Sequence, residues 1–188
     1  MPETEPLLHG DYEYLSDGYY ACLSAELEGL EPVPTCADAL DAYVVPIALI
    51  RVEKAGLPIP SWYLSNEYVA PPAILYGVNP FARNHAVVLD QEQCEDAARS
   101  ISRNGKFVMC CQEITHDAQL VEFEQVLGWT PDQRFSEWAP ALYSLFGLPL
   151  ASVRLIGIGD QFYFSAIERL PRTRLSPACQ QYLAQTAP

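Results

Sequence analysis

One short segment carries the residue types that most readily bind a ligand. It reads N-P-F-A-R-N-H over residues 79–85, and its polar members are Asn79, Arg83, Asn84 and His85. An arginine guanidinium can hold a carboxylate or phosphate through two parallel hydrogen bonds, and a histidine can act as a general base near neutral pH. The segment therefore predicts a polar clamp for an anionic group. The alternative is a loop that asparagine side chains hold by hydrogen bonds to the backbone.

A second group of candidate residues is aromatic and lies near the start of the chain. Between Asp11 and Thr35 the sequence contains Tyr12, Tyr14, Tyr19 and Tyr20. Each combines a large apolar ring with a hydroxyl, so such a cluster can line a pocket or pack within the core. The candidate ligand contacts here, forming one wall of a site alongside the polar clamp, are Tyr14, Ser16, Tyr19 and Tyr20.

Other familiar chemistries lack their residues in this sequence. The histidines are His9, His85 and His116. They are isolated from one another, so we expect no metal site. The chain has no G-x-S-x-G, no P-loop and no G-x-G-x-x-G after a strand, and its only lysines are Lys54 and Lys106. Because nucleotide sites usually use lysine to offset phosphate charge, we also expect no nucleotide or other cofactor.

The charge of the chain is strongly negative and concentrated at its front. The formal net charge is −13, and no Lys or Arg precedes Arg51. The same segment carries Glu3, Glu5, Asp11, Glu13, Asp17, Glu26, Glu28, Glu31, Asp38 and Asp41. Such a surface repels phosphate backbones and anionic lipid, so nucleic-acid and membrane partners are disfavoured. It favours a basic partner surface or a cationic ligand, or it is a solvated face that aids solubility.

The cysteines and the chain start bear on the compartment. The six cysteines include no C-x-x-C pair, and the first ten residues lack the basic and apolar regions of a signal peptide. No apolar run approaches the ~18 residues of a membrane-spanning helix. We therefore expect reduced, mostly buried thiols in a cytoplasmic protein.

Periodicity and turn signals predict an α+β fold. Helices are expected over residues 18–28, from 35 to 55 with a kink or restart at Pro46, and over 91–103, 134–146 and 175–185. Strands are expected over 62–64, 85–89, 107–114, 120–127, 150–158 and 161–168, and residues 65–83 are expected to be a loop. The pattern predicts one domain over 11–188 after a flexible tail over 1–10. It has a mixed or mainly antiparallel sheet with helices on one face, a C-terminal hairpin and a short terminal helix.

The first helix has clear local signals. Ser16 or Asp17 is a suitable N-cap, because either side chain can accept a free N–H of the first turn. Gly29 suits the position after the last turn. The apolar residues Tyr20, Leu23 and Leu27 fall at i, i+3 and i+7, which makes one apolar stripe along a helix.

The same stretch resembles a known family. The run Tyr14-Leu15-Ser16-x-Gly18-Tyr19-Tyr20-x-x-Leu23-x-Ala25-Glu26-x-x-Gly29 closely resembles the N-terminal domain found ahead of RimK-like ATP-grasp ligases, whose pattern is Y-x-Y-L-S-x-G-Y-Y-x-S-L-L-A-E-A-R-G-H. Two further stretches are similar to parts of the same proteins, Leu145-Phe146-Gly147-Leu148-Pro149-Leu150 and Ala55-Gly56-Leu57-Pro58-Ile59-Pro60. His9-Gly10-Asp11 stands where that family has a basic segment.

The resemblance implies a module that works beside an amide-forming ligase. The sequence shows no glycine-rich lid, no lysine pair for a nucleotide and no closing Glu-x-Asn for magnesium, so we expect no catalysis by this chain alone. The lead hypothesis is a non-catalytic accessory or substrate-binding module linked to peptide or amino-acid amide-bond formation. Its partner would be an ATP-grasp ligase or a small amino-acid-like substrate.

Two alternatives remain open. One is a stand-alone small enzyme that uses the same loop, with His85 as general base and Arg83 in its site. The other is a structural subunit that acts only through protein interaction.

Overall fold

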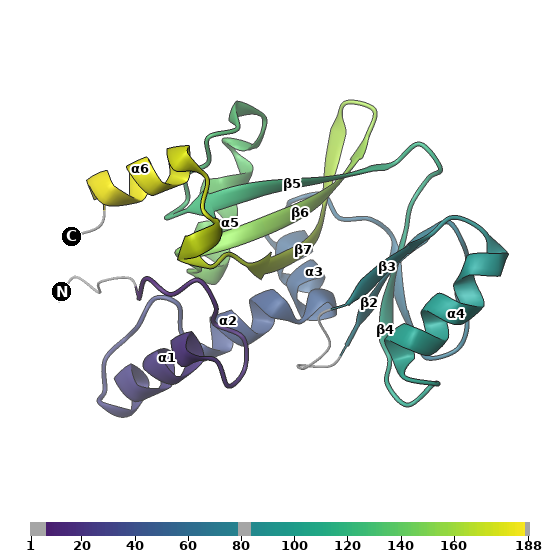
Figure 1. Ribbon diagram of the computed structural model, residues 1–188, viewed down its shortest axis with the longest axis horizontal. Helices are drawn as coiled ribbons and strands as arrows, with labels where there is room; N and C mark the ends of the chain where they lie inside the picture. The colour runs from purple at the N-terminus through teal and green to yellow at the C-terminus, as the bar shows by residue number, and fades with distance from the viewer. Residues whose placement is uncertain (1–6, 79–83, 187–188) are drawn as a thin grey trace. The chain divides into compact units, whose positions relative to one another are not determined.

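The structure is a computed structural model that describes residues 7–78 and 84–186. Within these ranges the chain forms six α-helices, two short 3-10 helices and seven β-strands (Figure 1). The helices are α1 (Asp17–Leu27), α2 (Cys36–Tyr43), α3 (Val45–Lys54), α4 (Gln91–Ser102), η1 (Gln133–Phe135), α5 (Trp138–Phe146), η2 (Arg172–Arg174) and α6 (Pro177–Thr186). The strands are β1 (Trp62–Ser65), β2 (Ala73–Gly77), β3 (His85–Val88), β4 (Met109–Glu113), β5 (Gln119–Val126), β6 (Leu150–Ile158) and β7 (Gln161–Arg169).

Local sequence signals set the ends of the first helices as predicted. The Ser16 hydroxyl accepts the backbone N–H of Tyr19 at 3.2 Å, which caps α1. Gly29 follows the C-cap with φ +79°, a left-handed conformation that glycine adopts without strain. Thr35 accepts the N–H of Asp38 at 3.0 Å at the start of α2. The helix restarts at Val45, where Pro46 occupies the first turn of α3 and needs no N–H partner.

The apolar stripe of α1 is largely exposed. Its buried residues are Gly18 and Cys22, whereas Tyr20 is 52% exposed and Leu27 is 80% exposed. The stripe therefore meets solvent at Tyr20 and Leu27 and is half-buried at Leu23 between them. The fully buried positions of the helix are the small residues Gly18 and Cys22. Helix α1 contacts α2, which in turn contacts α5 (Figure 1).

The first sheet has four antiparallel strands in the order β1-β4-β2-β3. Strand β2 lies inside it and is buried from Ala73 to Tyr76. The prediction that residues 65–83 form a loop is therefore wrong over this strand. A strand covered on both faces is continuously apolar instead of alternating, and the short run A-I-L-Y between Pro72 and Gly77 gave no periodic signal.

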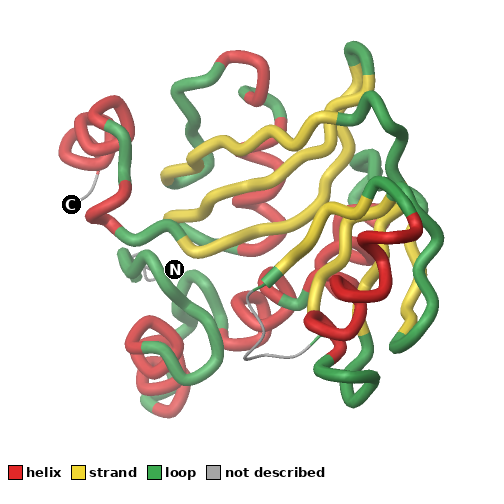
Figure 2. The backbone as a smooth tube through the Cα atoms, turned by 45° about the vertical axis from the view of Figure 1, so that its right-hand side comes forward, coloured by secondary structure: helices red, strands yellow, loops and turns green. Residues whose placement is uncertain are grey.

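Helix α4 covers one face of this sheet, as Figures 1 and 2 show. Alternate residues of the central strands face it. The buried cluster beneath the helix includes Ala73, Leu75, Met109, Cys111, Ala98 and Ile101. The other face of the same strands carries Ile74, Tyr76, Cys110 and Gln112.

The second sheet has three strands in the order β5-β6-β7. Strands β6 and β7 form the predicted hairpin through Gly159-Asp160, and Gly159 has φ +59°. At the other end of these strands, Val126 and Leu150 share a buried cluster with Cys179 and Leu183 of α6. The α+β class, the mainly antiparallel sheets, the C-terminal hairpin and the short terminal helix are thus confirmed.

The chain divides into two compact units. Unit 1 comprises Met1–Tyr43, Glu122–Arg154 and Ala166–Pro188, and unit 2 comprises Val44–Val121 and Leu155–Ser165. The single domain over 11–188 and the flexible tail over 1–10 stay predictions, and residues 1–6 of that tail lie outside the described residues. In the rest of the tail, the Leu7 N–H donates to the Val33 carbonyl at 2.9 Å.

Candidate functional site

A tight turn in unit 1 presents the residues that open α1. The Asp11 carbonyl accepts the Ser16 hydroxyl at 3.0 Å, and one Asp11 carboxylate oxygen accepts the Glu13 N–H at 3.0 Å. The other carboxylate oxygen pairs with Arg169 Nη1 at 3.2 Å. Leu15 completes the turn with φ +68°. These bonds hold the turn against β7 and set the direction in which the following side chains point.

Gly18 allows the turn and the helix to approach closely. A Cβ atom at this position would lie 2.2 Å from the Asp11 carbonyl oxygen and 2.9 Å from the His9 Cβ. Only glycine leaves room for this approach, so the glycine in Tyr14-Leu15-Ser16-x-Gly18 has a packing role.

Three of the four tyrosines gather on the surface of unit 1. The Tyr14 and Tyr19 rings are 5.3 Å apart at 73°, and the Tyr19 and Tyr20 rings are 6.3 Å apart at 72°. Tyr14 is 41% exposed. Tyr12 differs because it is fully buried, its hydroxyl donating to the Leu7 carbonyl and accepting the His9 N–H. The structure thus brings Tyr14, Tyr19 and Tyr20 together and assigns Tyr12 to the core.

Ser16 lies beside these rings, and its hydroxyl is already engaged in the turn and the cap. Its contact with a ligand stays a prediction. Burial, followed by the neighbouring Cys36 thiol and Tyr14 hydroxyl, raises the pKa of Tyr19 above its usual value. The Tyr19 hydroxyl is therefore neutral at physiological pH. The negative charge of this surface comes from carboxylates such as Asp17 and Glu28, both of which are exposed.

The predicted polar clamp belongs to unit 2 and is described only at its end. Asn79 and Arg83 lie outside the described residues. Asn84 and His85 are exposed, and His85 begins β3. The imidazole stacks on the Tyr76 ring, with centroids 5.6 Å apart and planes at 26°. The clamp and the role of His85 as a general base stay predictions.

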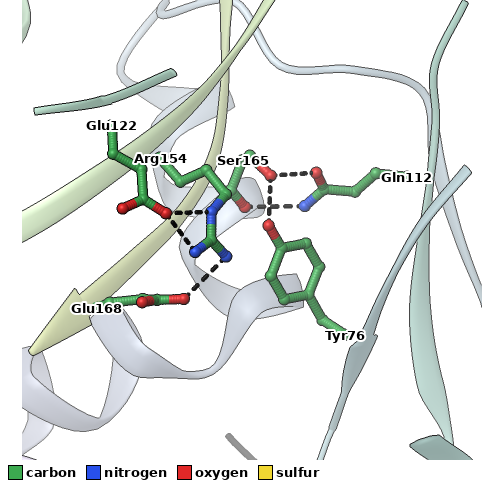
Figure 3. A network of polar contacts seen from close by, with 6 residues as sticks. All are labelled: Tyr76, Gln112, Glu122, Arg154, Ser165 and Glu168. Carbon is green, nitrogen blue, oxygen red and sulfur yellow. Dashed lines mark hydrogen bonds and ion pairs between the residues drawn. The ribbon is translucent and has the colours of Figure 1, made fainter. Parts of the chain in front are cut away.

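Tyr76 belongs to a buried network of hydrogen bonds that was not predicted from the sequence (Figure 3). The Ser165 hydroxyl donates to Gln112 Oε1 at 2.6 Å, so the Tyr76 hydroxyl, 2.8 Å away, is the donor to Ser165. Gln112 Nε2 donates to the Ser165 carbonyl at 2.8 Å. Ser165 and Gln112 are fully buried. The one available signal was a glutamine placed directly after the apolar run Val108–Cys111.

Unit 1 contains a second network, centred on Arg154 of β6 (Figure 3). Its guanidinium donates from Nε to Glu122 of β5 at 2.9 Å and from Nη1 to Glu168 of β7 at 2.8 Å. The arginine side chain is 5% exposed, whereas both carboxylates reach solvent. Two carboxylates thus neutralise one buried cation across three neighbouring strands, which suits holding the strands in register more than binding an anion.

The cysteines are not arranged for chemistry. All six are free and buried. Burial raises the pKa of Cys110 to about 12 and that of Cys111 to about 11. Since the thiolate is the reactive form, these thiols are poor nucleophiles near neutral pH. Across the described ranges, no group of three or more His, Cys, Asp or Glu residues could hold a metal ion. In the same ranges, no helix has the length and apolar character needed to cross a membrane.

A pocket of about 460 Å³ lies in unit 2 beside the end of α4. It is lined by Asn66, Glu67, Glu95, Ala98, Arg99, Ser102, Asn104 and Gly105. Arg99 pairs with Glu95 at 3.2 Å on the exposed helix surface. Of the predicted ligand contacts that the structure describes, none lines this pocket.

The turn and capped helix described above belong to a recognisable domain. The protein-family model named RimK-like ATP-grasp N-terminal domain matches the sequence over residues 8–186. The chain belongs to this family. The resemblance seen in the sequence is thereby confirmed, and the match extends over nearly the whole chain. A search of curated proteins found no match.

Solved structures of ATP-grasp enzymes share the fold. D-alanine–D-alanine ligase from Helicobacter pylori is similar with a TM-score of 0.63 at 14% identity, over 89% of this chain and 66% of that one. A RimK domain ATP-grasp protein from Sphaerobacter thermophilus gives 0.60 at 17% identity, over 87% and 72%. L-amino acid ligase from Bacillus licheniformis gives 0.58 at 13%, over 80% and 45%. The chain therefore spans roughly two thirds or less of the first and third of these proteins, and the likeness is one of fold.

Proposed function

We propose that this member of the RimK-like ATP-grasp N-terminal domain family is a non-catalytic accessory or substrate-binding module of amide-bond formation. Family membership is the observation that carries the proposal. Two of the proteins that share its fold are named as ligases of amino acids, D-alanine–D-alanine ligase and L-amino acid ligase. The ligand class proposed for this chain is accordingly a small amino acid or a short peptide, and its protein partner an ATP-grasp ligase in the cytoplasm.

The arrangement around α1 supports a binding role. Tyr14 and Tyr20 expose 41% and 52% of their surface, more than core packing requires of a large aromatic ring. The buried thiols with raised pKa values support the absence of nucleophilic chemistry at the described cysteines. Tyr14, Ser16, Tyr19 and Tyr20 are the proposed ligand wall in unit 1, and Asn79, Arg83, Asn84 and His85 the proposed clamp in unit 2.

A thermal-shift screen with amino acids, dipeptides and ATP tests the proposal. A ligand at about 100 times its Kd adds about 2.7 kcal/mol to the free energy of unfolding. For a chain of this size each kcal/mol raises Tm by about 2–4 °C, so a true ligand raises Tm by about 5–10 °C. We expect this shift with an amino acid or peptide. A comparable shift with ATP alone would contradict the accessory role and favour the stand-alone enzyme.

Calorimetric titration of the ligand found then assigns the contacts. Tyr14→Ala is expected to weaken binding by about 1–2 kcal/mol, the usual cost of losing an aromatic anchor. The matched control is Tyr68→Ala, which removes a ring that is 68% exposed in unit 2. Arg83→Ala is expected to cost about 1–3 kcal/mol if its guanidinium holds a carboxylate. Unchanged binding in either test variant removes that residue from the site.

A further inference from the structure

The exposed hydrophobic side chains of unit 1 are concentrated in one place. Among its described residues, every large hydrophobic side chain that is exposed lies between residues 14 and 30. They are Tyr14 at 41%, Leu15 at 48%, Tyr20 at 52%, Leu27 at 80% and Leu30 at 59%. Scattered exposed hydrophobics are ordinary, but a set gathered on one helix and the residues just before and after it favours an interaction surface.

Two of these residues form a stripe along α1. Tyr20 and Leu27 are seven positions apart, which places them on the same face of a helix. Gly18 and Cys22 lie on the opposite face and are buried. The helix therefore has two faces that could each be covered: a small-residue face that packs within unit 1, and an aromatic and aliphatic face that meets solvent.

The charge beside this stripe is of one sign. Asp17, Glu28 and Glu31 are exposed around it, and the first fifty residues contain no Lys or Arg. Exposed tyrosine rings attract cationic side chains through their π faces, and the carboxylates add a long-range attraction. A partner that covers Tyr20 and Leu27 with apolar groups would place its own flanking residues against these carboxylates. Complementarity therefore requires those flanking residues to be basic.

We propose that the solvent face of α1, defined by Tyr20 and Leu27 with Tyr14 of the preceding turn and with Asp17 and Glu28 beside them, docks a basic amphipathic segment of another protein. This proposal rests on the proposed accessory function and names the chemistry of its protein partner. The segment would lay apolar residues on Tyr20 and Leu27 and aim lysine or arginine side chains at the carboxylates and the tyrosine rings.

A defined probe tests the docking surface. The probe is a peptide of about 15 residues that, as a helix, carries leucines on one face and arginines on the other. It is titrated calorimetrically into the full chain. Its counterpart carries glutamate at every arginine. We expect one peptide per chain, an affinity that falls as salt rises from about 50 to 200 mM, and no binding of the acidic counterpart.

Matched variants then assign the surface. Leu27→Ser is expected to weaken binding of the basic peptide at least about tenfold, while Leu64→Ser, a change at a leucine that is 51% exposed in unit 2, leaves it within about twofold. Glu28→Gln combined with Glu31→Gln should weaken binding and flatten its salt dependence. Glu67→Gln combined with Glu137→Gln makes the same charge change at exposed sites elsewhere and should not.

Other outcomes overturn the proposal. No binding at millimolar peptide would exclude a basic segment, and equal losses in test and control variants would show nonspecific attraction to an acidic protein. A dimer by light scattering that Leu27→Ser dissociates would assign the surface to a second copy of this chain. Leu27 is not among the proposed small-ligand contacts, so failure here leaves an amino-acid thermal shift in the same variant intact. If the unaltered chain bound the basic peptide but showed no thermal shift with amino acids or dipeptides, the proposed small ligand would be ruled out instead.

Discussion

Replacing Gly18 by alanine tests how the first turn and the first helix fit together. The added methyl would lie 2.2 Å from the Asp11 carbonyl oxygen and 3.1 Å from Tyr12 Cδ1. Asp11 cannot move freely, because its carbonyl accepts the Ser16 hydroxyl and its carboxylate pairs with Arg169. Relief of the contact must therefore displace the turn and disturb the helix cap.

The expected magnitude follows from three effects. Forcing a methyl into a packed site costs about 1–3 kcal/mol, and a weakened cap costs about 1 kcal/mol more. Alanine regains at most about 1 kcal/mol through its higher helix propensity. Gly18→Ala should therefore lower the free energy of unfolding by about 1–4 kcal/mol. At about 2–4 °C for each kcal/mol, Tm should fall by about 2–16 °C.

Urea denaturation followed by circular dichroism measures this change against two controls. Gly29→Ala places a methyl where nothing lies within 4 Å, at φ +79°, so it should cost only the left-handed conformation, about 1–2 kcal/mol. Ser24→Ala, at an exposed position inside α1, should be neutral or slightly stabilising. If Gly18→Ala behaves like Ser24→Ala, the close approach of Asp11 to the helix is not real.

Two further predictions concern buried polar groups. Ser165→Ala should cost about 1–3 kcal/mol in the same urea assay, because it removes the hydroxyl that donates to the buried Gln112 Oε1. Adding Gln112→Leu should then cost less than the sum of the two single changes. The thiols give a pH dependence: burial raises the pKa of Cys110 to about 12, so the folded chain holds a proton that the unfolded chain loses near pH 9. This contribution to stability should be complete below pH 9 and decline up to about pH 12, and a flat profile over that window would contradict it.

The sequence predicted the features that depend on neighbouring residues. The Ser16 cap and the restart at Pro46 each follow from a few adjacent side chains, so each could be predicted from local sequence. The hairpin at Gly159-Asp160 is of the same kind. These signals need no knowledge of tertiary packing.

The features that depend on distant residues were missed. Strand β2 is continuously apolar because both of its faces are covered, and coverage is a property of the fold. The sequence showed the apolar stripe of α1 but could not show which way it faces. The bonds from Gln112 and Tyr76 to Ser165 join positions 53 and 89 residues apart, and nothing in local spacing indicates such a pair.

Two kinds of residue can now be separated in the stretch that carries the family resemblance. Folding accounts for Ser16 and Gly18, one as a cap and the other as the site of a close backbone approach. Folding does not account for Tyr20 and Leu27, because a protein gains little stability from large apolar side chains that stay in water. A binding partner that covered Tyr20 and Leu27 would remove their apolar surface from water, and this burial would contribute to the free energy of binding. The solvent face of α1 is for this reason the first place to look for what the module binds.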